Sequence, residues 1–202
     1  MAVVGSQCTI ISRTSLYANV AAYSPDLPCK RIEIVDASIA YDCPYTLETT
    51  LLVIRNSLHI PEMNQNLISP LMLREAGIQV DEMPKLHATE PTQEHHRIYD
   101  AETKLSIHLK LKGILSYFPC RKLTRTETEN WEEQNVVFLT PDAEYWNPNN
   151  EYYAEGEDGM LDFDGDITMH AAHEKNEVIS AAGLSSLYAD PITWDRYKTI
   201  VY

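Results

Sequence analysis

Closely spaced cysteines and long apolar runs are both missing from this sequence, and their absence excludes several classes of protein. The four cysteines, Cys8, Cys29, Cys43 and Cys120, form no CxxC pair, so a zinc knuckle and a thioredoxin-like redox motif are excluded. We expect them to be buried free thiols in an intracellular, reducing compartment, cytoplasmic or nuclear. No window approaches the roughly 18 apolar residues of a membrane helix, and residues 1–15 lack the pattern of a signal peptide. We therefore expect no membrane partner.

Positive charge is also scarce. Lys and Arg number 16 against 30 Asp and Glu, which gives a net charge of -14. Because such an excess repels a phosphate backbone, we expect no direct contact with nucleic acid. Between Thr126 and His173 there is no Lys or Arg, while 13 acidic residues occur and no apolar period is sustained. Residues 126–202 are therefore predicted to be an acidic, largely disordered linker and tail, with a short helix indicated only at 174–188.

The rest of the chain has the composition of a folded domain. Hydrophobic residues make up 44% of the 202 residues, which is in the range of globular proteins. Apolar and polar residues alternate in several segments that are rich in Val, Ile, Leu and Thr, and this pattern is typical of half-buried strands. The predicted strands are 9–11, 31–41, 46–54, 58–60 and 105–111, with the second and third paired as a hairpin. The inner face of the last strand is predicted to be Leu105, Ile107, Leu109 and Leu111.

One segment departs from the strand pattern. After residue 66 the apolar spacing suits a short helix, with Asn66 or Ser69 as its N-cap and Pro70 as its first residue. Gly77 is placed to end it, because glycine adopts the left-handed conformation that follows many helices. Residues 1–125 are therefore predicted to form a mainly β domain with one short helix.

A longer pattern surrounds this helix. Ile60-Pro61 is followed by four residues that are polar except for Met63, then by Asn66-Leu67-Ile68-Ser69 and the helix that ends before Gly77. Pro61 lacks an amide hydrogen and closes a strand ladder, while Leu67 and Ile68 are expected to enter the core.

This pattern resembles the protease segment of copia-type LTR retrotransposon Gag-Pol polyproteins, although those more often have Val-Pro than Ile-Pro. The resemblance covers residues 1–125. It implies a small retropepsin-like β-barrel in which the short helix packs beneath the active site. It further implies an aspartic endopeptidase that acts on polyprotein segments, assembles its active site as a homodimer and uses no cofactor.

Proteases of this kind cleave peptides with two carboxylates that share one proton, each from an Asp-Thr/Ser-Gly-Ala/Ser turn. The matching turn here is Val3-Val4-Gly5-Ser6, just before the first predicted strand. Gly5 and Ser6 fit its last two positions, but Val3 stands where the catalytic Asp belongs and Val4 at the Thr/Ser position. A valine neither activates water nor accepts a proton, so no catalytic residue is intact and we expect an inactive site.

Two explanations for this degenerate turn remain open. Either the reading frame begins inside the protease, which leaves the barrel N-terminally incomplete, or the sequence is a decayed copy that has lost the aspartate. We favour the first, because only a few residues precede the turn where a retropepsin barrel has a strand. On that account, Val3→Asp combined with Val4→Ser restores little or no pepstatin-sensitive cleavage.

Other polar clusters carry weaker signals for metal binding. Residues 162–166, Asp-Phe-Asp-Gly-Asp, resemble the opening of a calcium loop. However, Ile167 and His173 stand where the loop requires Gly and a bidentate Glu. His170 and His173 are one helical turn apart, but no third zinc ligand can be assigned. We therefore predict no metal site.

The remaining titratable and aromatic groups have ordinary explanations. His95 and His96 lie in a polar loop, and Asp36 and Asp42 lack the Thr/Ser-Gly that follows a catalytic Asp, so we assign both to turns or rims. The exception is an aromatic cluster within the acidic segment, which is either a short docking peptide or a scatter of aromatics in a tail. Its members are Tyr145, Trp146, Tyr152 and Tyr153.

Three functions are consistent with these features. The first is a retrotransposon polyprotein fragment, once an aspartic endopeptidase and now without its catalytic residue. The second is a non-catalytic peptide- or protein-binding module derived from such a protease. The third is an unrelated acidic interaction protein whose tail binds the partner. Proteolysis by the unaltered chain would contradict the inference that Val3 leaves the site inactive.

Overall fold

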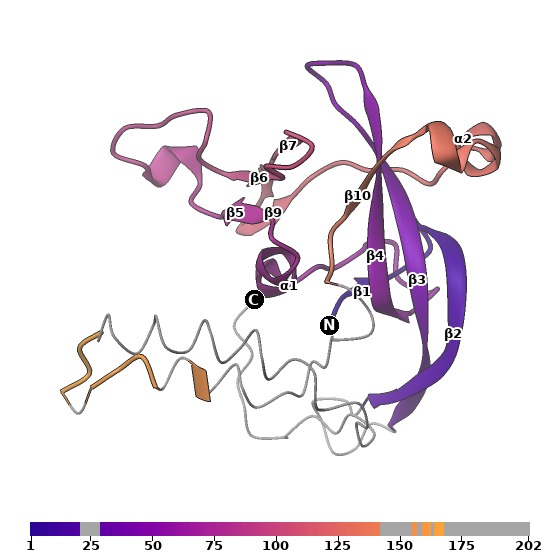
Figure 1. Ribbon diagram of the computed structural model, residues 1–202, viewed down its shortest axis with the longest axis horizontal. Coiled ribbons are helices and arrows are strands. Elements are labelled where there is room, and N and C mark those ends of the chain that lie inside the picture. The colour runs from indigo at the N-terminus through magenta and orange to yellow at the C-terminus, as the bar shows by residue number, and fades with distance from the viewer. Residues whose placement is uncertain (21–28, 142–154, 157–158, 163, 168–202) are drawn as a thin grey trace.

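A mainly β architecture is found in the computed structural model, which describes residues 1–20, 29–141, 155–156, 159–162 and 164–167 (Figure 1). The largest sheet has the strand order β1-β4-β3-β2, and β10 also pairs with β4. The prediction of a mainly β fold is therefore confirmed. The predicted closed barrel is wrong for the described residues, because this sheet is open and ends at the unpaired side of β2. Its strands are β1 (Val3–Val4), β2 (Thr9–Val20), β3 (Lys30–Asp42), β4 (Thr49–His59) and β10 (Asn135–Phe138).

The predicted hairpin is the centre of this sheet. β3 and β4 pair antiparallel along nearly their whole lengths, from Ile34 opposite Leu58 to Asp42 opposite Thr49. Residues 43–48 connect them, so β4 begins three residues later than predicted. It continues past a bulge at residues 55–56 to His59 and so includes the first two residues of the separate strand expected at 58–60. Its Val, Ile and Leu content suits this central place, since residues 50–54 point alternately to the two faces of the sheet and are all buried.

β4 has two further neighbours on its other side. β10 pairs parallel with its first half, and β1 pairs parallel with its last residues. β10 lies beyond the boundary that we expected near Arg125, so the folded unit continues to at least residue 140, where Thr140 is 2% exposed. The acidic segment predicted to begin at residue 126 therefore begins inside the fold, and the helix predicted at 174–188 lies outside the described residues.

The segment before β10 is fixed by ion pairs. It contains α2 (Arg125–Glu129) and the 3-10 helix η2 (Trp131–Glu133). The Arg121 guanidinium donates to both oxygens of Asp42, at 2.8 and 2.9 Å, and to both oxygens of Glu127, at 2.8 and 2.7 Å. Glu127 also closes a capping box with Thr124 at the start of α2. These bonds tie the segment to the β3–β4 hairpin.

The short helix forms as predicted. α1 (Pro70–Glu75) has Ser69 at the N-cap position and Pro70 as its first residue. It ends in a Schellman motif, in which Ile78 N–H donates to Leu73 O at 3.0 Å and Gly77 adopts a φ of +80°. Because Ile78 and Leu73 are both buried, this C-terminus directs the chain back into the core.

The middle of the chain forms two small sheets. β5 (Gln79–Asp81), β6 (Arg97–Tyr99) and β7 (Ser106–His108) form one, and β8 (Lys110–Lys112) and β9 (Leu115–Tyr117) form the other. The 3-10 helix η1 (Lys85–His87) lies between β5 and β6. The strand predicted at 105–111 is thus split in two at Leu109. Its inner face is correct at Ile107, which is fully buried, but wrong at Leu111, which is 38% exposed.

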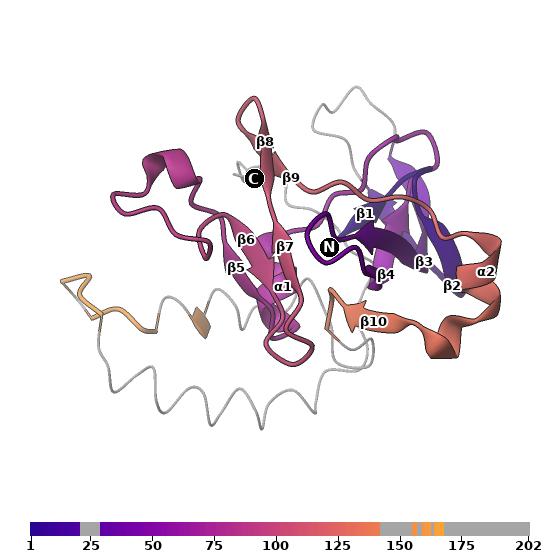
Figure 2. The same ribbon diagram turned by 90° about the horizontal axis from the view of Figure 1, so that it is seen from above.

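A single main core joins the large sheet to the middle of the chain. One face of β3 and β4 packs against α1 and the β5–β6–β7 sheet, which lie together on one side of the large sheet in Figures 1 and 2. Its fully buried members include Val35, Ile39, Tyr41, Ile54, Met72 and Ile107.

The four cysteines are all unpaired, as predicted. Cys8 and Cys43 are buried, but Cys29 and Cys120 are exposed, so the expectation of buried thiols is wrong for two of the four. Among the described residues, no helix has the length and apolar character needed to cross a bilayer.

Candidate functional site

The turn Val3-Val4-Gly5-Ser6 lies between the end of β4 and the segment that leads to α1. Leu58 N–H and Ile60 N–H each donate to the β1 side at 2.9 Å, the first to Ala2 O and the second to Val4 O. On the opposite side, Val3 N–H donates to Leu67 O at 2.9 Å, and Leu67 N–H donates back to Val3 O at 2.8 Å. The backbone of β1 is therefore bonded on both sides.

Gly5 has room only for a hydrogen atom. Its N–H donates to Oδ1 of Asn66 at 2.9 Å. A Cβ at this position would overlap the carbonyl oxygen of Met63 and lie 2.8 Å from that of Gln65. Asn66 was predicted as a possible N-cap of the helix, but its side chain accepts from a backbone amide 61 residues earlier in the chain. The turn is thus held by contacts to residues 63–67.

The two valines of the turn face different environments. Val4 is fully buried in the main core, whereas Val3 is half-buried against a smaller cluster that includes Leu58. Leu67, which we expected in the core, is 47% exposed. The turn therefore presents an aliphatic side chain at the position where the resemblance places a carboxylate, and it supplies no proton acceptor.

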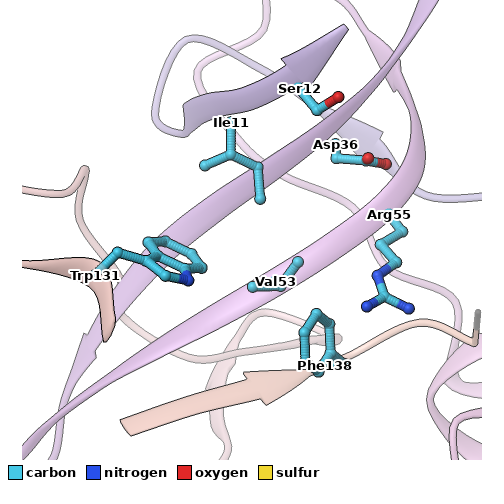
Figure 3. A pocket seen from close by; sticks show the side chains of 7 residues that line it. All are labelled: Ile11, Ser12, Asp36, Val53, Arg55, Trp131 and Phe138. Atoms are coloured by element: carbon cyan, nitrogen blue, oxygen red, sulfur yellow. The ribbon is translucent and has the colours of Figure 1, made fainter. Parts of the chain in front are cut away.

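A second feature is an open hollow of about 350 Å³ on the large sheet. It crosses four strands, and Trp131 from η2 covers one side of it (Figure 3). Two bulges flank Asp36: β2 has one between Ile10 and Ser12, and β4 has one opposite Asp36 itself. Bulges redirect side chains and are common beside binding sites. The lining residues are Ile11, Ser12, Asp36, Val53, Arg55, Trp131 and Phe138.

The walls of the hollow differ in polarity. Figure 3 shows Ile11 and Trp131 on one side, Val53 at the centre, and Ser12, Asp36 and Arg55 on the other side. One oxygen of Asp36 accepts from the Asn56 N–H at 2.9 Å. The Arg55 guanidinium stacks 4.0 Å from the centre of the Phe138 ring. Such a site suits a ligand with an apolar side chain next to polar groups.

The hollow and the turn do not combine into a carboxylate dyad. In the sheet register Val3 pairs with Leu58, and Leu58 pairs with a β3 residue two positions before Asp36. Standard strand spacings then put the α carbons of Val3 and Asp36 roughly 12 Å apart. Two carboxylates share a proton only when they are about 3 Å apart. An aspartate at position 3 would not reach Asp36 within one chain.

No family model, curated protein or solved structure matches this chain.

The other residues singled out in the sequence have structural partners. Asp42 accepts from Thr49 Oγ1 at 2.8 Å and from Arg121, whose hydrogen bonds lower the pKa of Asp42. His95 bonds to Thr92, and the buried His96 lies 2.9 Å from Ser116 Oγ through its Nε2 atom. These contacts give Asp42, His95 and His96 structural partners within the fold.

In the acidic motif at 162–166, a carboxylate oxygen is hydrogen-bonded to backbone groups of the same motif. Oδ1 of Asp162 accepts from the backbone N–H groups of Asp164 and Asp166, both at 2.9 Å. Among the described residues, no group of three His, Cys, Asp or Glu side chains is placed to hold a metal ion. His170, His173 and the aromatic cluster of Tyr145, Trp146, Tyr152 and Tyr153 lie outside the described residues.

Sequence reasoning noticed Asp36 but not the hollow. It assigned Asp36 to a turn or rim, whereas the structure puts it in the middle of β3 between two bulges. Trp131 and Phe138 were placed in the tail and were not considered. An available signal was the pair of β-rich apolar residues Val136 and Val137 within the acidic segment, which indicates a strand there.

Proposed function

We propose that this chain is a catalytically inactive relative of the copia-type aspartic proteases, the protease segment of a retroelement polyprotein without its catalytic carboxylate. The proposal includes a retropepsin-like origin of the fold. It is supported by the pattern from Ile60 to Gly77, and by the order of β4, the segment 63–67 and α1 around the turn.

The observation that carries the proposal is the environment of Val3-Val4-Gly5-Ser6. The turn is bonded on both sides and closely packed at Gly5, yet both side chains at its first two positions are aliphatic. Peptide hydrolysis by this class requires a titratable oxygen there. A homodimer of the chain would bring together two such turns and still no carboxylate.

The test is a cleavage assay on the pure, unaltered chain. We expect no hydrolysis of unfolded proteins or of peptides from pH 3 to pH 7, as measured by mass spectrometry with and without pepstatin. Val3→Asp tests whether a carboxylate at position 3 is enough for cleavage. Val3→Asn is its matched control, because asparagine has the shape of aspartate without the charge. Pepstatin-sensitive cleavage by the unaltered chain would contradict the proposal.

A second candidate function, a non-catalytic peptide-binding module, is favoured by the hollow. A peptide side chain could contact Ile11, Val53 and Trp131, while its backbone reaches Ser12 and Asp36. The lining contains no histidine beside the Ser12 hydroxyl, and its carboxylate, Asp36, accepts a hydrogen bond from the Asn56 N–H. Binding without cleavage is the activity that this lining supports.

A pair of substitutions on β2 tests this second function. Ile11→Asp places a charge in the hollow, and Leu16→Asp places the same charge on the same strand outside the lining. Both residues are exposed, at 40% and 60%, so neither change disturbs the core. Binding of a peptide library by the chain and by Leu16→Asp, with loss in Ile11→Asp, supports the module. Equal loss in both variants, or no binding by the unaltered chain, excludes it.

A further inference from the structure

The β8–β9 hairpin exposes apolar side chains that no described residue covers. Ile114 at its turn is 97% exposed, Leu115 is 61% exposed and Tyr117 is 43% exposed. In Figure 2 the hairpin extends beyond the β5–β6–β7 sheet. Contiguous apolar groups on a projecting element are typical of an interaction surface.

The charge around this hairpin is opposite to that of the chain. From Thr103 to Arg125 there are six Lys and Arg and no Asp or Glu, although the net charge of the whole chain is -14. Arg121 and Arg125 are paired with carboxylates. Within the described part of the chain, Lys110 and Lys112 have no ion-pair partner. The hairpin is therefore a locally positive site, and its charge is unmatched at these two lysines.

The register of the hairpin sorts its side chains onto two faces. Lys110 pairs with Tyr117 and Lys112 pairs with Leu115, so these four side chains share one face. Leu111 and Ser116 are on the other face, where Ser116 Oγ lies 2.9 Å from Nε2 of the buried His96. Burial and the charge of Lys85 lower the pKa of His96, which keeps it neutral near pH 7. This contact holds one face of the hairpin to the domain and leaves the lysine face open.

The hairpin also has an unpaired edge. β8 and β9 form a sheet of two strands only, and among the described residues no backbone group bonds to the outer side of β8. A two-stranded sheet is marginal by itself, and an open edge accepts an extended peptide as a third strand. Lys110 and Lys112 both belong to β8, so their side chains lie next to this open edge.

We propose that β8 binds an extended acidic segment of a partner protein, with the pattern acidic-apolar-acidic, as a third strand of the β8–β9 sheet. In this arrangement the two acidic side chains lie beside Lys110 and Lys112 on the open face. The apolar residue between them points to the other face, beside Leu111, which is 38% exposed. Charge complementarity and the alternation of the strand together specify this pattern. The proposal does not depend on a retroelement origin or on the hollow.

An anionic membrane is the alternative binding partner for a hairpin that exposes both apolar side chains and lysines. The net charge of -14 opposes it, because the whole molecule is repelled by a negative surface at long range. An extended acidic peptide makes only local contacts and the backbone bonds of a strand, so the observations favour it.

The experiment measures peptide binding to the full chain by fluorescence anisotropy. The probe is a labelled peptide of alternating Asp and Val, and its control is a peptide of the same composition with the Asp residues grouped together. We expect the alternating peptide to bind about tenfold more tightly, which corresponds to about 1.4 kcal/mol. Equal binding of the two peptides would contradict the strand arrangement.

Charge-reversal variants test whether the peptide binds beside Lys110 and Lys112. We expect Lys110→Glu combined with Lys112→Glu to weaken binding at least about tenfold. Lys30→Glu combined with Lys104→Glu has the same change of net charge and should alter binding by less than about twofold. All four lysines are exposed, so both variants should fold. A similar loss in both variants would show that only net charge matters and would overturn the proposal.

Hydrogen exchange gives a readout that does not depend on the variants. Addition of the alternating peptide should slow exchange at the amides of residues 110–112 and leave β2 unchanged. Protection at β2 instead of β8 would overturn the proposal. So would binding of phosphatidylserine vesicles, through Lys110 and Lys112, in preference to the peptide.

Discussion

Gly5→Ala should be among the most destabilising single-methyl changes in this protein. The new Cβ would overlap the carbonyl oxygen of Met63 and lie 2.8 Å from that of Gln65. Both neighbours are backbone atoms, so no side-chain rotation relieves the overlap. The turn itself would have to move by about an ångström, since carbon and oxygen atoms normally stay more than about 3 Å apart.

That displacement affects two groups of interactions. It weakens the hydrogen bonds from Gly5 N–H to Asn66 and from Ser6 N–H to Met63, each contributing about 1 kcal/mol. It also shifts Val4, which is fully buried, and overpacking of this kind costs about 1–3 kcal/mol. We therefore expect a loss of about 3–5 kcal/mol in the free energy of unfolding. For a chain of this size that lowers the melting temperature by about 8–15 °C.

The assay is urea unfolding followed by circular dichroism, with Gly77→Ala as the matched control. Gly77 has a φ of +80° but no atom within 4 Å of the position that a new methyl group would take, so its cost is only the backbone strain of about 1 kcal/mol. Gly5→Ala should exceed it at least about twofold. A Gly5→Ala variant as stable as the unaltered chain would show that the turn is not held against residues 63–67.

Three further predictions concern stability. Arg121 holds the pKa of Glu127 at about 2, below its usual 4.5, so the stabilisation of about 1–2 kcal/mol is complete above pH 4.5 and is lost as the pH falls toward 2. Acid titration of Glu127→Gln should show a shallower loss over that range. Asn66→Ala should cost about 1–2 kcal/mol in urea unfolding, because the Gly5 N–H loses its acceptor. Ile107→Ala should cost about 2–4 kcal/mol, whereas Ile114→Ala, at a 97% exposed position, should change stability by less than about 0.5 kcal/mol.

Elements with local signals were predicted well from the sequence. The β3–β4 hairpin has two β-rich runs around a turn, and α1 has Pro70 at its start and Gly77 after its end, so neighbouring residues alone determine both. The strand at 105–111 shows the limit of this reasoning. Its period of two is perfect, yet the chain breaks at Leu109, because Leu109 N–H bonds to His96 O and β8 turns away to pair with β9.

Features that depend on distant residues were missed. β10 was assigned to the acidic tail by composition, but its four residues find a partner in β4, about 85 residues earlier. The hollow was not predictable either, because it depends on bulges that place Ile11 and Asp36 on one surface with Phe138. The turn at Val3 was identified by motif, but the acceptor for its Gly5 amide, Asn66, required the three-dimensional arrangement.

The parallel pairing of β10 with β4 has a consequence for how the chain folds during synthesis. The first half of β4, from Thr50 to Val53, has no strand paired to its outer edge until Asn135–Phe138 have been synthesised. Long-range parallel contacts of this kind form slowly, and an uncovered apolar strand edge readily pairs with another molecule. A chain terminated at residue 125 should therefore self-associate through β4, while a chain extended to residue 141 should remain monodisperse. In that case the short strand β10, with acidic residues on both sides, would be the last segment to cover the edge of the central strand during synthesis.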